Sequence, residues 1–157
     1  MTSVPTPTPS LALLKQYSLF GGLLDAQLQH LIQYLQVETH VAGSVIVRQG
    51  ERGDRLWCLI EGQVEVTRSA GTGSPAVSIA RLGPGATIGE MELIDMQPRS
   101  GTVTALTPCT LYALALRNIL ALQREDLPAF SLVMMNLARD LSRRLRQMDA
   151  AMAEKTK

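Results

Sequence analysis

Hydrophobic periodicity divides the chain into a helical start, a strand-rich middle and a helical end. Between residues 25 and 35, leucine and isoleucine side chains recur on one face of a helix, and Asp25 is placed to cap it. From residue 37 to residue 115, apolar and β-branched residues occur in short runs that glycine or proline ends every few positions. The middle of the chain is therefore predicted to consist of β-strands.

The strands predicted in this middle part are short, and turn residues separate them. They span Val37–Val41, Val45–Arg48, Arg55–Ile60, Gln63–Arg68, Ala76–Leu82, Thr102–Leu106 and Leu111–Ala115. Glycine, proline and aspartate occupy the segments between them. Many short strands joined by such turns are typical of a β-barrel or a jelly roll, so we predict a mainly β fold with flanking helices.

Two helices are predicted after Leu116, where the hydrophobic period becomes helical again. The second begins near Pro128, a residue that is well tolerated in the first turn of a helix. Apolar residues in this second helix alternate by four and three, the spacing of a coiled-coil seam: Met134, Ala138, Leu141, Leu145, Met148 and Met152. Such a face packs onto the barrel of its own chain or forms a homodimer, and the two are compatible.

Length and charge limit the partners to be expected. A chain of 157 residues has the size of one compact domain. Its 15 basic and 14 acidic side chains leave a net charge of +1, too small for a global field that holds a nucleic acid or a membrane. The arginines from Arg139 to Arg146 are diluted by Asp140 and Asp149, which indicates a solvated helix face. We expect neither DNA nor a membrane as a partner, and an anionic ligand must be bound locally.

The first residues and the cysteines indicate where the protein resides. No signal peptide opens the chain and no apolar stretch approaches the ~20 residues that span a bilayer, so the cytoplasm is the expected compartment. Prolines recur near the start, and we expect residues 1–10 to be a disordered arm before one domain of residues 11–157. Cys58 and Cys109 lie within apolar runs, which favours packed free thiols.

Catalytic and metal chemistry are not indicated. The sequence shows no nucleophile with a matching base and no cluster of metal ligands, so we do not expect an enzyme, a metal or a resident cofactor. His30, His40 and two cysteines are too few and too scattered for a haem or iron–sulfur sensor.

One segment differs from an ordinary barrel strand: IGEMELIDMQPRSGTV, residues 88–103. Gly89, followed by Glu90, Met91 and Glu92, permits a tight turn into a short helix, whose first N–H groups have no partner within the helix. Those donors, with the positive end of the helix dipole, favour an anion such as a phosphate.

Arg99 and Ser100 add further groups that suit a phosphate. Arg99 follows Pro98, whose fixed φ stiffens the chain and directs the guanidinium. A planar guanidinium suits a phosphate diester, and an ionised Glu90 accepts a hydrogen bond from a sugar hydroxyl. From the residues alone, a surface arginine beside an ordinary Gly-Glu turn remains the alternative.

The segment resembles the phosphate-binding cassette of cyclic nucleotide-binding domains, which protein kinase A regulatory subunits, cyclic nucleotide-gated channels and catabolite-activator-type regulators share. The matching positions need no gap: Gly89, Glu90, Met91, Leu93, Arg99 and Ser100. Upstream, VIVRQGERGDRLWCLIEGQVEV resembles the paired strands of the family, with Gly53 at an expected turn and Trp57 in the core strand. The resemblance covers about residues 20–148 and implies a jelly-roll barrel at about 37–115, followed by hinge and lid helices at about 116–153.

The resemblance also implies a ligand and residue roles. Arg99 would pair with the cyclic phosphate and Glu90 with the ribose 2′-hydroxyl. Gly89, Met91 and Glu92 would line the backbone cradle, with Ser100 at the phosphate or the purine. In some channel-type relatives an arginine of the lid helix reaches the purine, for which Arg143 and Arg144 are the candidates in this sequence.

The implied function is that of a sensor that binds a cyclic mononucleotide, cyclic AMP (cAMP) rather than cyclic GMP (cGMP). It would signal by moving its C-terminal helices against an effector protein whose identity the sequence does not reveal. A DNA-reading relative needs a helix-turn-helix beyond the long helix, and this chain ends at Lys157, so DNA reading is not expected.

Glu92 departs from the family pattern, which has a small residue at this position. Turned inward, its carboxylate would repel a phosphate and pair with Arg99. Such a pair would lower the affinity for the phosphate ligand by about a hundredfold. Turned outward, it would interact favourably with the start of the helix. The first case favours an alternative function, in which the chain is a degenerate barrel that does not bind nucleotide and acts as a dimerisation or docking module through its Met-rich last helix.

Overall fold

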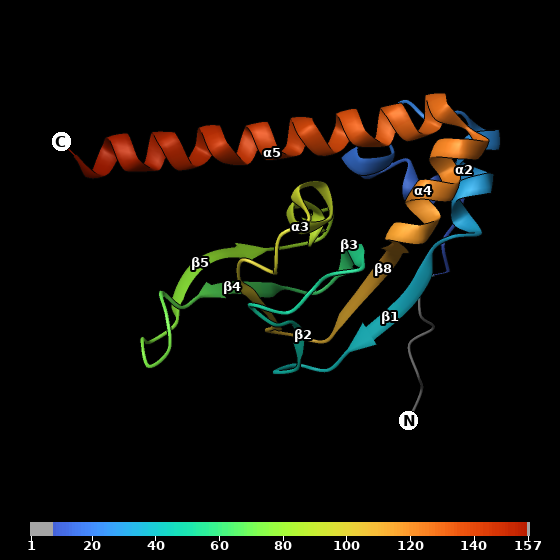
Figure 1. Ribbon diagram of the computed structural model, residues 1–157. Coiled ribbons are helices and arrows are strands. Elements are labelled where there is room, and N and C mark those ends of the chain that lie inside the picture. The colour runs from blue at the N-terminus through green and yellow to red at the C-terminus, as the bar shows by residue number, and fades with distance from the viewer. Residues whose placement is uncertain (1–7, 157) are drawn as a thin grey trace.

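Residues 8–156 are described in the computed structural model of the chain, and they form a jelly-roll barrel flanked by helices (Figure 1). Along the chain the elements are α1 (Leu11–Leu14), η1 (Ser18–Phe20, a 3₁₀ helix), α2 (Asp25–Ile32), β1 (Gln36–His40), β2 (Val45–Val47), β3 (Arg55–Glu61), β4 (Val64–Arg68), β5 (Val77–Leu82), β6 (Thr87–Ile88), α3 (Glu90–Asp95), β7 (Thr102–Ala105), β8 (Cys109–Ala115), α4 (Leu116–Glu125) and α5 (Leu127–Lys155).

Two antiparallel four-stranded sheets build the barrel, in the orders β1-β8-β3-β6 and β2-β7-β4-β5. Every predicted strand is present within a residue or two of its expected bounds. The strand β6 was not predicted, because two residues directly before the cassette are too few to show an alternating pattern. Its pairing with β3 fixes the cassette against a strand whose residues from Leu56 to Ile60 are all buried.

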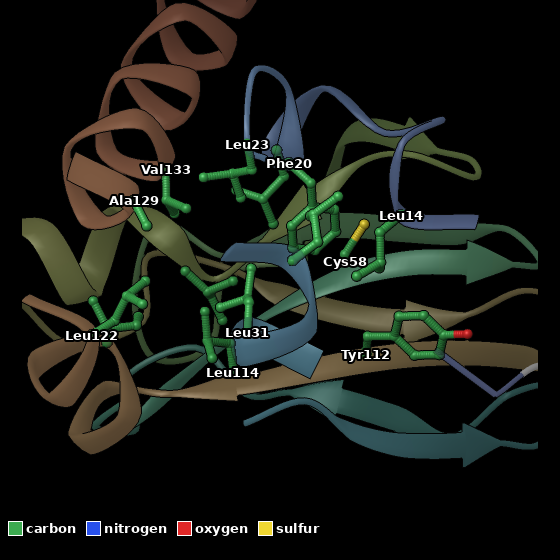
Figure 2. Packing of buried hydrophobic residues seen from close by; sticks show 14 of the residues in the cluster. Leu14, Phe20, Leu23, Leu31, Cys58, Tyr112, Leu114, Leu122, Ala129 and Val133 are labelled. Carbon is green, nitrogen blue, oxygen red and sulfur yellow. The ribbon is translucent and has the colours of Figure 1, made fainter. Parts of the chain in front are cut away.

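The strand β3 lies between two apolar cores. Its residues from Leu56 to Ile60 are all buried, and alternate side chains point to opposite faces. Trp57 and Leu59 pack inside the barrel, whereas Leu56, Cys58 and Ile60 pack against the helices. Figure 2 shows the core on the helical side, where Cys58 lies near Phe20 and Leu14. The cassette that follows β6 is therefore attached to a rigid part of the molecule.

Both cysteines are buried free thiols, as predicted. Burial raises the pKa of Cys58 to about 12, and it also raises the pKa of Cys109. No helix of residues 8–156 is long and apolar enough to cross a membrane.

The start of the chain corrects one prediction. Asp25 does not cap α2; the helix is capped at Leu24, whose N–H donates to Gln27 Oε1 at 2.9 Å. Asp25 lies in the first turn, where a carboxylate suits the helix dipole, and forms an ion pair with Lys15 at 2.7 Å. Ser10, the last residue of the predicted disordered arm, caps α1 through a bond from Leu13 N–H at 3.2 Å. Residues 1–7 of that arm lie outside the described residues.

The long helix α5 starts where the sequence predicts. Asp126 caps it by accepting from Ala129 N–H at 3.1 Å, and Pro128 occupies the first turn. Its buried residues end at Leu137, so the apolar packing of the helix on the domain is confined to its first part. Beyond the barrel the helix projects freely (Figure 1), and the seam residues Leu145, Met148 and Met152 are 60%, 56% and 66% exposed. Packing on the barrel thus accounts for the first part of α5 and leaves the end of the predicted seam uncovered.

Asn136 anchors α5 to the N-terminal segment, and its removal is expected to destabilise the fold. The buried amide donates to Leu19 O at 3.0 Å and Gly21 O at 2.9 Å. Asn136→Ala leaves two carbonyl oxygens without these donors, so the free energy of unfolding should fall by about 1–3 kcal/mol. Urea unfolding measures this loss. Gln147→Ala, at an exposed position of the same helix, should change it by no more than about 0.5 kcal/mol, and equal losses for the two variants would contradict the anchor.

Candidate ligand-binding site

The cassette begins with a tight turn that requires glycine. Gly89 caps α3 with φ of 79°, in the left-handed region that other residues rarely adopt. A Cβ atom at this position would lie 2.6 Å from Arg99 Nη1 and 3.1 Å from Trp57 Cζ3. The predicted turn into a short helix is present, and its backbone approaches the arginine closely.

Arg99 is not a surface residue; its side chain is 4% exposed. Nη1 donates to Gly89 O at 2.7 Å and Nη2 to Arg55 O at 2.8 Å. The guanidinium carbon lies 5.3 Å from the centroid of the Trp57 ring, a cation–π arrangement. Gly53 also packs directly against the guanidinium, because a Cβ atom at this position would overlap it. The cation is thus held in one position by backbone carbonyls, an indole and a glycine.

Glu92 points inward, so the outward alternative is wrong. Its Oε2 lies 3.3 Å from Arg99 Nη1, and its Oε1 accepts from Ser100 N–H at 3.0 Å and Ser100 Oγ at 2.9 Å. The Glu92 side chain is only 9% exposed. Burial opposes its ionisation, but the bonds from Ser100 and the charge of Arg99 outweigh burial and lower the pKa of Glu92. The carboxylate thus occupies Ser100 and one edge of the Arg99 guanidinium, the groups that were predicted to bind a phosphate.

Glu90 is buried and hydrogen-bonded to α5, the helix that was expected to form the lid. Arg144 Nη1 donates to Glu90 Oε1 at 2.9 Å, and Arg144 Nη2 donates to Thr87 O at 2.6 Å. Burial raises the pKa of Glu90, and the nearby Arg144 counteracts part of that effect. Arg143 is instead 62% exposed and pairs with Asp140 at 3.2 Å. Of the two lid-helix candidates, only Arg144 lies at the cassette.

A cavity of about 100 Å³ borders the cassette, and its lining includes Glu90, Glu92, Ser100 and Arg144. Met91 also borders it, although its side chain is half exposed. Arg99 borders a different cavity, of about 320 Å³, on the side of the β2–β3 turn. In this conformation the cation is therefore separated from the cassette cavity, and Glu92 lies beside it.

The structure adds residues to the site that the sequence did not assign to it. Gly53 and Trp57 were predicted only as a turn and a core residue, yet both contact the guanidinium of Arg99. The carbonyl groups of Arg55 and Thr87 have no signal in a sequence, because any residue supplies one. Within residues 8–156, no group of three or more His, Cys, Asp or Glu side chains is arranged to hold a metal ion.

Comparisons with known proteins agree with this geometry. The family model described as "Cyclic nucleotide-binding domain" matches residues 37–126. A cyclic nucleotide-gated potassium channel of Mesorhizobium japonicum is 44% identical over 96 residues, which cover 61% of this chain and 25% of the channel. The cyclic AMP receptor protein of Thermus thermophilus is 37% identical over 136 residues, which cover 87% of this chain and 61% of the receptor.

A solved structure extends the likeness to the fold. A cyclic nucleotide-binding domain from Methylobacillus flagellatus matches with a TM-score of 0.83 and 26% identity, covering 94% of this chain and 82% of that one. The chain spans less than two thirds of the length of the channel and of the receptor. Because the family model matches more than half of its residues and the barrel and cassette are in place, the chain belongs to the cyclic nucleotide-binding domain family.

Proposed function

We propose that residues 11–157 are a sensing domain that binds a cyclic mononucleotide, cAMP in preference to cGMP, and carries out no chemical step. The observation that carries the proposal is the buried Arg99, fixed by Gly89 O and Arg55 O beside a glycine turn. A buried, directed guanidinium beside the first turn of a short helix suits a phosphate diester. The names of the two curated relatives support a cyclic nucleotide as the ligand.

The bound state follows from the donors present. The cyclic phosphate accepts hydrogen bonds from Arg99 and Ser100, and the backbone of α3 beyond Gly89 contributes N–H donors. Glu90 accepts from the ribose 2′-hydroxyl, and its burial makes that bond strong because water does not compete for it. Apolar side chains that border the cassette cavity, such as Val47 and Leu82, cover the rest of the ligand.

The signal passes through Arg144, because this residue joins Glu90 to α5. A ribose hydroxyl and Arg144 share the same carboxylate, so ligand binding changes the contact that holds α5 over the cassette. The moving helix then presents its projecting end, with Leu145, Met148 and Met152, to an effector protein or to α5 of a second copy.

Arg144→Ala is expected to loosen α5 without unfolding the barrel. The variant loses the bonds from Arg144 to Glu90 and to Thr87 O, which join α5 to the cassette. Amide exchange of residues 138–150 should become at least about tenfold faster, since one charge-assisted pair contributes about 1.5–3 kcal/mol. Arg143→Ala removes an ion pair between a largely exposed arginine and Asp140 and leaves the contacts of Arg144 in place, so it should leave these rates within about twofold. Equal rates for both variants would rule out Arg144 as the link.

A second candidate function has one observation in its favour. The pair of Glu92 with Arg99 fills the phosphate position from within the protein. If no nucleotide displaces it, the chain is a dimerisation or docking module that acts through the exposed end of α5.

Calorimetric titration with cAMP and with cGMP separates the two functions, and 5′-AMP serves as a control that lacks the cyclic diester. The proposal expects a dissociation constant in about the micromolar range for cAMP, weaker binding of cGMP, and no comparable binding of 5′-AMP. Absence of binding by both cyclic nucleotides at millimolar concentration would favour the docking module.

A further inference from the structure

We propose that Glu92 is an internal competitor of the nucleotide phosphate, and that nucleotide binding to this chain is coupled to uptake of a proton by Glu92. The inference rests on the proposed function, because it requires that a cyclic nucleotide enters the cassette. It names the regulation of that site: the module responds to the nucleotide and to acidity together.

The competition follows from the donors that one carboxylate occupies. Ser100 N–H, Ser100 Oγ and Arg99 Nη1 all face Glu92, at 3.0, 2.9 and 3.3 Å. A phosphate diester bound at the cassette needs the same three donors, and two anions cannot share them at hydrogen-bonding distance. The nucleotide must therefore displace the Glu92 carboxylate before it can contact Arg99.

The charge balance of the site shows what happens to the displaced carboxylate. In the described state, Glu90 and Glu92 are balanced by Arg144 and Arg99. A phosphate monoanion adds one negative charge to this buried group, where charge interactions are stronger than in water. One proton on Glu92 restores the balance.

Two further charged groups near the site are acidic and do not supply the missing positive charge. From the β2–β3 turn, Asp54 lies close enough to interact with Arg99, and it is already paired with Arg55 at 3.0 Å. From α5, Asp140 interacts with Glu90 and carries the same sign. Both are acidic, so they favour a protonated Glu92 when the phosphate is present.

The direction of the pH effect follows. In the free protein the bonds from Ser100 and Arg99 keep the pKa of Glu92 below its usual value, so the group is ionised at neutral pH. In the complex those bonds are lost and a phosphate lies nearby, so its pKa rises. Affinity for the nucleotide should therefore increase as pH falls through the raised pKa, by up to about tenfold per pH unit.

The experiment is calorimetric titration with cAMP at about pH 6 and about pH 8, each in two buffers of different ionisation enthalpy, which together count the protons taken up. The proteins are the wild type, Glu92→Gln, Glu92→Ala and the control Glu65→Gln. Glu65 lies on β4 and pairs with Arg81 at 3.8 Å, away from the cassette. Thermal unfolding of each variant establishes that it is folded.

The wild type and Glu65→Gln should bind more tightly at the lower pH and take up a fraction of a proton that grows as pH falls. Both Glu92 variants should bind at least about tenfold more tightly at pH 8 and lose the proton uptake. His30 and His40 are present in every variant, so uptake that persists without Glu92 would belong to other groups and overturn the inference.

The other possible outcomes of the titrations also support or refute the competition by Glu92. Binding by the Glu92 variants alone, with none by the wild type, supports the competition. Equal affinity of the wild type and the Glu92 variants, without pH dependence, refutes the inference and leaves the proposed function standing. No binding by any of the four proteins at either pH refutes the proposed function, and the inference with it.

Discussion

Arg99→Ala is expected to lower the affinity for a cyclic nucleotide at least about a hundredfold, because in the proposed complex its guanidinium is the cation that pairs with the phosphate. Arg144 of α5, which also borders the cassette cavity, is bound to Glu90 and to Thr87 O and cannot replace it. Calorimetric titration measures this loss of affinity, under conditions in which the wild type binds.

The same substitution should also lower stability, which requires a control. Without Arg99, the buried Glu92 keeps its bonds from Ser100 but loses its cation, and breaking a buried pair costs about 3–5 kcal/mol. Arg99→Lys keeps the charge without the planar fork and should bind more weakly than the wild type while remaining better folded than Arg99→Ala. Arg48→Ala, at an exposed position near the β2–β3 turn, should retain binding. Unchanged affinity in folded Arg99→Ala would contradict the assignment of the site.

Gly53→Ala is expected to abolish binding nearly as completely, although Gly53 itself touches no ligand. A methyl group there would overlap the Arg99 guanidinium, which is enclosed by Trp57 and two backbone carbonyls and has little room to shift. Either the arginine or the turn must move, and a shift of about an ångström is enough to lose a directed contact. We expect a loss in affinity of at least about tenfold and in stability of about 1–3 kcal/mol.

Gly71→Ala is the matched control for this prediction. A Cβ atom at Gly71 meets nothing within 4 Å, so the identical chemical change should leave both binding and stability near the wild-type values. If Gly53→Ala binds as Gly71→Ala does, the guanidinium is not held as tightly as its contacts indicate.

Local signals explain why so much of the fold and the cassette is predictable from sequence. Each strand shows its own alternation and turn residues, and the cassette from Gly89 to Ser100 is contiguous, so its residue types and spacing are visible together. Trp57 was expected in the core strand, and its indole does lie within the barrel. These features depend on residues that are close along the chain.

The features that sequence leaves open depend on side-chain direction and on distant contacts. Whether Glu92 turns inward is decided by two bonds from Ser100, which a sequence pattern does not show. The choice of Arg144 over Arg143 depends on the rotation of α5 relative to a carboxylate 54 residues earlier in the chain. The cap of α2 was misassigned because Gln27 reaches back to Leu24 and leaves Asp25 free to pair with Lys15.

In the proposed complex, a cyclic nucleotide enters the cassette and displaces Glu92 from Arg99 and Ser100. A ¹H–¹⁵N spectrum of the labelled protein titrated with cAMP tests this displacement, because the Ser100 amide donates to Glu92 in the free protein and the Arg99 Nε–H belongs to the guanidinium that pairs with it. We expect these resonances and that of Gly89 to shift together and to saturate at the calorimetric affinity. Saturable shifts that leave Gly89, Arg99 and Ser100 unchanged, or a spectrum that does not respond to cAMP, would contradict the proposed displacement.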